Sequence, residues 1–167
     1  MNVVIVGGGK VGTHLASMLL AEGHRVKVIE SQSNELRTLH EELPAGIVVP
    51  GSGTDLAVLE ATGIREADVL AAVTGTDATN LVATSLARFE FGVPRTIARV
   101  KDPRNAWMFT PVMGVDVAVD QAGFMARLIA EELSMGNMMT LLKLSKGEYS
   151  LVEEQVHPSA PAANRKI

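Results

Sequence analysis

Residues 3–15 read VVIVGGGKVGTHL. The run that opens this stretch, 3–6, is apolar and mostly β-branched, which is typical of a strand buried on both faces of a parallel sheet. Glycines follow at positions 7, 9 and 12, and an apolar pattern with helical spacing begins at Lys10. In a dinucleotide-binding turn the first glycine permits a tight reversal, the second lets the backbone approach a pyrophosphate, and the third lets the helix pack against the strand. The stretch therefore predicts a phosphate-binding turn that contains Gly7, Gly9, Lys10, Val11 and Gly12.

An acidic residue at the end of the next apolar run supports this prediction. Glu30 follows residues 26–29, about 20 positions after the turn, where dinucleotide-binding folds carry a carboxylate that binds ribose. A carboxylate there accepts hydrogen bonds from both ribose hydroxyls and repels a 2′-phosphate, which disfavours NADP. The alternative is a strand-end carboxylate that binds no ligand. A Walker A loop is excluded, because Thr13 rather than a Lys-Ser or Lys-Thr pair follows Gly12.

Length and composition limit the class of protein. The chain has 167 residues, which is enough for one well-buried domain, and a net charge of −4, which argues against a nucleic-acid binder. No run of about 18 uncharged apolar residues is present. The chain has no cysteine, and its four histidines lack the spacing of metal ligands, so we expect neither a disulfide nor a metal site.

Strand and helix patterns alternate along most of the chain. The sequence predicts strands over 3–6, 25–29, 47–49, 69–73, 96–100 and 115–119. It predicts helices over 10–21, 34–43, a short stretch after Asp55, 77–90, a stretch that starts at Pro103, and 121–135. The helix over 77–90 is expected to bury Leu81, Val82, Leu86 and Phe89. Right-handed crossovers then give a Rossmann-like α/β fold, a doubly wound parallel six-stranded sheet of order 3-2-1-4-5-6 within residues 1–136.

The remaining residues, 137–167, have a different pattern. Two strands are predicted, over 138–144 and 149–156, with a turn between them, and the stretch 157–167 contains two prolines and no periodicity. We interpret 137–167 as a linker and the first strands of an incomplete C-terminal domain.

Several motifs together resemble one known family. They are the glycine turn with Lys10 at its fourth position, Glu30, and the segments 51–55, 59–68, 72–80, 98–103 and 113–116. These residues are similar to the N-terminal domain of the TrkA and KtrA family, whose module also occurs in RCK (regulator of K⁺ conductance) domains. The likeness extends over nearly the whole predicted sheet.

The resemblance implies a regulatory function. Members of this family are cytoplasmic regulatory subunits of bacterial potassium uptake systems and bind NAD(H), ATP, ADP or AMP in the Rossmann crevice. They dimerise and assemble into rings, which would be tetrameric or octameric here, on a membrane potassium-translocating subunit of the Trk or Ktr type. Nucleotide exchange then gates ion flux. The resemblance therefore implies a non-enzymatic protein at the inner face of the cell membrane, held there by its partner.

The resemblance also implies further site residues. It gives Ser52, Gly53, Thr54 and Asp55 contacts with the base, although Thr54 could instead cap the short helix. From their position at the end of the fourth predicted strand, across from the glycine turn, Thr74 and Gly75 would lie along the phosphates or the second ribose. In many nucleotide-gated relatives a Pro-Glu pair stands where this chain has Gln121 and Ala122, so we expect no sensing of a γ-phosphate or cation by that carboxylate.

Three cations lie near the predicted crevice. Lys10 would stabilise phosphates as a point charge, or it is a solvated lysine. Arg99 and Lys101 share one face of the fifth strand, and Lys101 reaches its carboxyl edge, where it contacts a terminal phosphate or a partner subunit, or is solvated.

Two other functions remain open from the sequence. One is a fragment of an NAD-dependent oxidoreductase, although no His or Lys stands beside a carboxylate in a way that suggests hydride transfer, and we assign no catalytic residue. The other is a nucleotide-binding adaptor unrelated to potassium.

Overall fold

The computed structural model describes residues 1–133, 138–144 and 149–154. The chain divides into two compact units, Met1–Ala122 and Gly123–Ile167, each of which is considered by itself below. The predicted boundary near residue 136 stays a prediction.

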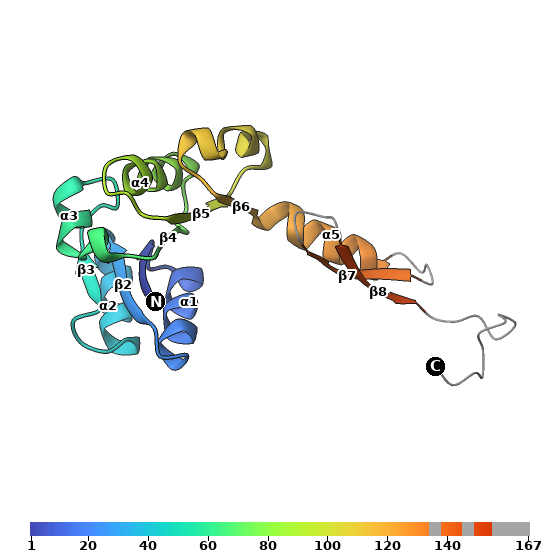
Figure 1. Ribbon diagram of the computed structural model, residues 1–167. Helices are drawn as coiled ribbons and strands as arrows, with labels where there is room; N and C mark the ends of the chain where they lie inside the picture. Colours follow the sequence, from blue (N-terminus) through green and yellow to red (C-terminus); the bar gives the residue numbers. More distant parts are fainter. Residues whose placement is uncertain (134–137, 145–148, 155–167) are drawn as a thin grey trace, which may run out of the picture. The chain divides into compact units, whose positions relative to one another are not determined.

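A parallel sheet forms the centre of the first unit (Figure 1). Its strands are β1 (Asn2–Val6), β2 (Arg25–Glu30), β3 (Val48–Pro50), β4 (Val69–Ala72), β5 (Arg95–Val100) and β6 (Val117–Asp120). All neighbouring strands pair in parallel, in the order β3-β2-β1-β4-β5-β6. The predicted fold class and strand order are confirmed.

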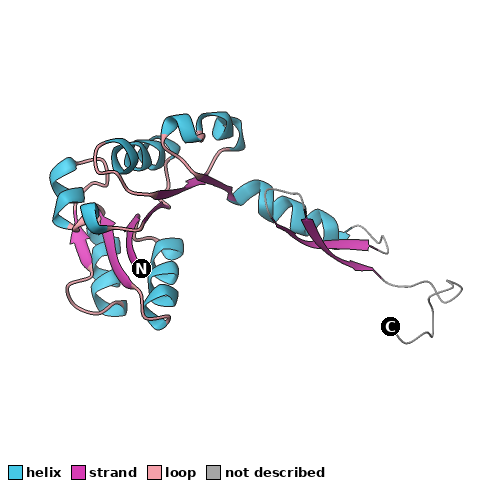
Figure 2. Cartoon of the chain, in the orientation of Figure 1, coloured by secondary structure: helices cyan, strands magenta, loops and turns pink. Residues whose placement is uncertain are grey.

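Helices alternate with these strands (Figure 2). They are α1 (Lys10–Ala21), α2 (Ser33–Glu42), α3 (Leu56–Ala61), α4 (Asp77–Phe89) and α5 (Gln121–Leu133), with 3₁₀ turns η1 (Ile64–Glu66), η2 (Pro103–Met108) and η3 (Pro111–Met113). None of the helices within the described ranges is both long enough and apolar enough to cross a membrane.

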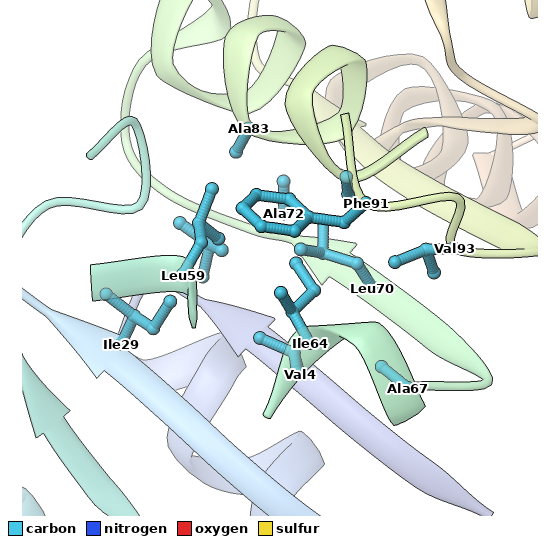
Figure 3. Packing of buried hydrophobic residues seen from close by; sticks show 12 residues of the cluster. Val4, Ile29, Leu59, Ile64, Ala67, Leu70, Ala72, Ala83, Phe91 and Val93 are labelled. Carbon is cyan, nitrogen blue, oxygen red and sulfur yellow. The ribbon is translucent and has the colours of Figure 1, made fainter. Parts of the chain in front are cut away.

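The two faces of the sheet carry separate apolar cores. Val3 and Ile5 of β1 pack in one core with Ala16 of α1 and Leu39 of α2. Val4 packs in the other core with residues of α3, η1 and α4 (Figure 3). Because successive strand residues point to opposite faces, β1 is buried on both sides, as its unbroken apolar run predicts.

Helix α4 differs from its predicted orientation. Val82 and Phe89 are 43% and 64% exposed, so the prediction that they are buried is wrong. The residues that α4 buries instead are small or polar: Asn80, Ala83, Thr84 and Ala87. Small side chains let the helix axis lie close to β4 and β5, which leaves the larger apolar residues at its flanks and on its outer side.

The segment between β5 and β6 is less regular than predicted. The expected helix from Pro103 is the 3₁₀ turn η2, followed by η3, and β6 begins at Val117 rather than Val115. Pro111 has no N–H to donate, so a continuous α-helix through it would lack a backbone hydrogen bond. Val115 is instead buried in a small core with Val100 and Phe109.

The second unit contains the remainder of α5 and a hairpin. The two predicted strands are present as β7 (Met138–Leu144) and β8 (Tyr149–Glu154), and they pair antiparallel. Residues 155 and 156 of the second predicted strand lie outside the described residues. Apolar side chains of α5 are about half exposed or more: Phe124, Met125, Ile129 and Leu133.

Candidate functional site

A cleft of about 680 Å³ opens at the carboxyl ends of β1, β2, β4 and β5. This is where the strand order reverses, between β1 and β4, and it is the position at which open α/β sheets bind ligands. Its volume is within the range of small-molecule sites. The lining residues are Val6, Gly7, Gly9, Lys10, Val11, Ile29, Glu30, Ser31, Gln32, Glu35, Gly51, Ser52, Gly53, Val73, Thr74, Gly75, Thr76, Thr79, Arg99 and Gln121.

The glycine turn between β1 and α1 forms the floor of the cleft. Gly7 has φ +107°, a conformation that side-chain-bearing residues rarely adopt, and a Cβ there would lie 3.0 Å from the backbone N of Thr74. At Gly12 a Cβ would overlap the carbonyl oxygen of Gly7. These two glycines therefore have the conformational roles that the sequence predicts, a tight reversal and a close approach of helix to strand.

Gly9 leaves space for a ligand. A Cβ at Gly9 would meet no atom within 4 Å, and its φ of −69° is open to any residue. Gly9 is the N-cap of α1, and no side chain caps this helix. The first N–H groups of a helix have no partner within it and carry the positive end of its dipole, so this turn can bind an anion.

Glu30 fixes the backbone on two sides of the cleft. The residue is 6% exposed, and its carboxylate accepts hydrogen bonds from the N–H of Gly8 (2.6 Å), Ser31 (2.7 Å) and Gln32 (2.8 Å). A carboxylate has about four acceptor positions. One position therefore remains for a ribose hydroxyl, where we expected two hydrogen bonds.

Thr13 holds the same turn from the helix side. Its hydroxyl donates to the carbonyl oxygen of Gly8 (2.8 Å), and its backbone N–H donates to the carbonyl of Gly9 (2.9 Å). Glu30 and Thr13 thus fix the two ends of one residue, Gly8. The sequence analysis does not predict this role for Thr13. The feature that could have indicated it is a residue with a hydroxyl group directly after the third glycine.

The structure brings ten of the fourteen predicted site residues together in the cleft. They are Gly7, Gly9, Lys10, Val11, Glu30, Ser52, Gly53, Thr74, Gly75 and Arg99. Of the other four, Gly12 lies buried beneath the turn, and Thr54, Asp55 and Lys101 are exposed and do not line it. Nine further lining residues were not considered as site residues. Three of them are valine or isoleucine, and the other six are glycine or polar residues that follow strand ends or lie at the N-terminal ends of helices: Ser31, Gln32, Glu35, Gly51, Thr76 and Thr79. The rule that ligands bind at the carboxyl ends of parallel strands would have found them.

The N-cap residue of α3 differs from the one that the sequence analysis considered. Asp55, not Thr54, caps this helix by accepting a hydrogen bond from the N–H of Ala57 (2.9 Å). The hydroxyl of Thr54 lies 2.8 Å from that of Ser52.

Charge is distributed unevenly along the cleft. Glu30 and Glu35 lie at its β2–α2 side, and Arg99 lies at the β5 side, with Lys10 at the start of α1. The Nε of Arg99 is buried and has no hydrogen-bond partner, which is costly unless a ligand supplies an acceptor. In the part of the chain that the structure describes, no group of three or more acidic or histidine side chains could hold a metal ion.

Lys101 is fixed through its backbone rather than its side chain. Its N–H donates to Oδ1 of Asp77 (2.6 Å), while Oδ2 of Asp77 accepts from the N–H of Asp102 (3.1 Å) and from the side chain of Asn105 (2.8 Å). Burial acts to raise the pKa of Asp77, but the hydrogen bonds from Asn105, Lys101 and Asp102 outweigh it and hold this pKa below its ordinary value.

Asp77→Ala should lower the free energy of unfolding by about 1–2 kcal/mol near neutral pH, because three donors lose their acceptor. Since the pKa of Asp77 in the folded state lies below its ordinary 3.8, this stability is present above that value and is lost as the pH falls through the folded-state pKa. Chemical denaturation at a series of pH values measures the difference between wild type and variant. A difference that does not shrink below about pH 4 contradicts the role of the ionised carboxylate.

Comparison with known proteins identifies the family. The model of the TrkA-N domain family matches residues 3–121. The chain belongs to the TrkA-N domain family. The resemblance found from the sequence is thereby confirmed.

Relatives of this TrkA-N chain carry potassium-uptake names. The chain is 35% identical over 167 residues to the Trk system potassium uptake protein TrkA of Mycobacterium tuberculosis, and the match covers 100% of the chain and 75% of that protein. It is 34% identical over 165 residues to a Trk system potassium uptake protein TrkA homolog of Methanothermobacter thermautotrophicus, with 99% and 75% covered.

Solved structures share the fold of this TrkA-N domain. GsuK bound to ADP has a TM-score of 0.68 at 24% identity, and the match covers 80% of this chain and 34% of that one. The GsuK channel bound to NAD has a TM-score of 0.64 at 22% identity, with 84% and 26% covered. The chain thus spans about a third or less of the length of GsuK.

Gln121 of the TrkA-N domain is the first residue of α5 and directly follows β6. It is exposed and lines the cleft, and Ala122 follows it. The neutral amide of Gln121 adds no negative charge to the cleft. The absence of a carboxylate-based γ-phosphate or cation sensor at this pair stays a prediction.

Proposed function

We propose that this chain is a nucleotide-sensing regulatory subunit of a potassium uptake system and binds NAD(H) or an adenine nucleotide (ATP, ADP or AMP) in the cleft. The observation that carries the proposal is the uncapped N-terminus of α1 behind Gly9, where a Cβ would meet nothing, at the switch point of the sheet. Membership of the TrkA-N family and the names of the TrkA relatives support the link to potassium. The ligands named for GsuK, ADP and NAD, support the ligand class.

The charge distribution suggests how the nucleotide lies. The ribose of the adenosine binds beside Glu30, which has one acceptor position left, and the base extends toward Ser52 and Gly53. The diphosphate lies on the Gly9 turn with Lys10 beside it, and the far end of the ligand reaches Thr74, Gly75 and Arg99. The nucleotide supplies binding free energy that differs between two conformations of the regulatory assembly, which is what a sensor requires.

Arg99→Gln should weaken ADP binding by about tenfold or more, because a charge-assisted hydrogen bond to phosphate is lost. Arg95→Gln is the matched control, since Arg95 lies on the same strand at its opposite, amino end and is exposed. Titration calorimetry measures both affinities. Equal effects of the two substitutions would remove Arg99 from the site.

The proposed partner is a membrane potassium-translocating subunit of the Trk or Ktr type, which would hold this chain at the cytoplasmic face of the membrane. We also propose that the chain forms homodimers that assemble into a tetrameric or octameric ring. The exposed apolar residues of α5, Phe124, Ile129 and Leu133, offer a surface for self-association.

The proposal assigns no catalysis to the cleft. Its lining contains no histidine, cysteine, tyrosine or aspartate, and its glutamates lie at the ribose side. Incubation with NADH and carbonyl substrates separates the regulatory proposal from an oxidoreductase, because steady turnover would contradict it. Potassium flux through vesicles that hold the translocating subunit tests the positive claim. Addition of this chain should make the potassium flux depend on nucleotide. A flux that changes neither when the chain is added nor when nucleotide is added would contradict the proposal.

A further inference from the structure

Asn80, in the first turn of α4, is a polar residue with 0% exposure. Its Oδ1 accepts hydrogen bonds from the backbone N–H of Thr74 (2.9 Å) and from the Thr74 hydroxyl (2.7 Å). Its Nδ2 donates to the carbonyl oxygen of Arg99 (2.9 Å). Because donors meet one side of the amide and a carbonyl meets the other, only one orientation of this side chain satisfies both.

The two partners of Asn80 belong to neighbouring strands. Thr74 follows β4 and Arg99 lies near the end of β5, and both line the cleft, whereas Asn80 does not. Asp77 lies three residues earlier on α4, on the same side of the helix, and binds the N–H groups of Lys101 and Asp102. The first turn of α4 therefore holds the chain at Arg99, near the end of β5, and at the two residues that follow the strand.

We propose that Asn80 is a positioning residue that sets the wall of the cleft facing the far phosphate of the bound nucleotide. This inference rests on the proposed function. Asn80 fixes the separation of β4 and β5 at their carboxyl ends, and thereby the positions of Gly75 and of the Arg99 guanidinium. The other wall, formed by Glu30 and the glycine turn, is held by hydrogen bonds of its own, from the N–H of Gly8 to Glu30 and from Thr13 to the carbonyl oxygen of Gly8.

Asn80→Ala tests the proposal against a matched control on the same helix. Thr84 also has 0% exposure, but its hydroxyl donates to the carbonyl oxygens of Asn80 and Leu81, neither of which lines the cleft. Calorimetry with AMP and ADP, at a temperature where all variants are folded, separates near and far phosphates. Asn80→Ala should lower ADP affinity by about tenfold and AMP affinity by less than about threefold, and Thr84→Ala should change neither by more than about threefold.

The outcomes distinguish this inference from the proposed function. A wild-type chain that binds neither nucleotide overturns the proposed function and this inference with it. If the wild type binds ADP, the inference alone is overturned by an unchanged ADP affinity in Asn80→Ala, by an equal loss for AMP and ADP, or by an equal loss in Thr84→Ala.

Asn80→Asp provides a second test that keeps the shape of the side chain. An ionised carboxylate can accept from Thr74 but cannot donate to the Arg99 carbonyl, whereas a protonated one can do both. At about pH 8 the ionised carboxylate keeps the two Thr74 donors and leaves the Arg99 carbonyl without one, so ADP affinity should be weaker than in the wild type. An ADP affinity equal to that of the wild type at this pH contradicts the proposal.

Discussion

Gly12→Ala is expected to abolish measurable nucleotide binding and to lower the free energy of unfolding by about 2–4 kcal/mol. The reason is that a Cβ at Gly12 would overlap the carbonyl oxygen of Gly7, which belongs to the backbone and cannot rotate away. Helix α1 must then move off β1, and the turn that holds the diphosphate opens. Denaturant unfolding measures the first effect and titration calorimetry with ADP the second.

Gly9→Ala is the matched comparison within the same turn. A Cβ at Gly9 meets no protein atom and φ is −69°, so stability should change by less than about 0.5 kcal/mol. The methyl group nevertheless lies where the phosphates approach the backbone, and ADP affinity should fall by about tenfold or more. Equal stability losses in the two variants would contradict the packing role of Gly12. An unchanged affinity in Gly9→Ala would contradict the position of the diphosphate.

Glu30→Ala is expected to have the second largest effect, a loss of about 2–4 kcal/mol in stability together with most of the nucleotide affinity. The carboxylate is nearly buried and accepts three backbone N–H groups, of which that of Gly8 lies in the glycine turn. Without an acceptor this buried N–H is unsatisfied, and the turn and the start of α2 lose their connection. Thermal unfolding and ADP titration of the same preparation measure both effects.

Glu35→Ala is the control for charge. Glu35 lines the same side of the cleft, and its carboxylate has only a 3.4 Å contact with the Asn34 side chain. Its removal should change stability by no more than about 0.5 kcal/mol. If Glu35→Ala and Glu30→Ala weaken ADP binding equally, ADP affinity depends on the negative charge at the β2–α2 side of the cleft and not on the hydrogen bonds of Glu30.

The sequence predicts the sheet well because its signals are local. Each strand is a short apolar run bounded by glycine, proline or polar residues. Because twisted parallel strands are connected almost always by right-handed crossovers, the strand order follows from this alternation. The roles of Gly7 and Gly12 can also be predicted from the sequence, since they depend on a turn of only six residues. The orientation of α4 could not be predicted, because the spacing of apolar residues does not show that α4 buries Ala83 and Ala87 and leaves Phe89 exposed.

Polar contacts within the site lie beyond what spacing can predict. Glu30 and Gly8 are 22 residues apart, Asn80 and Arg99 are 19 apart, and Asp77 and Lys101 are 24 apart. The two residues of each pair lie at or just after the carboxyl ends of neighbouring parallel strands, or in the helix that follows one of them, and they meet because these strands end at the same edge of the sheet. The sequence therefore indicated which residues surround the cleft, but not that Glu30 and Asn80 use most of their hydrogen-bonding capacity on the protein itself.

The most direct test of the central claim is a crystal structure of the chain grown with saturating ADP. We expect the diphosphate within about 3 Å of the N–H groups at the start of α1, beside Gly9, with a ribose hydroxyl at Glu30. A cleft that contains no nucleotide at an ADP concentration shown by calorimetry to saturate the protein, or ADP bound elsewhere on the chain, would contradict the account.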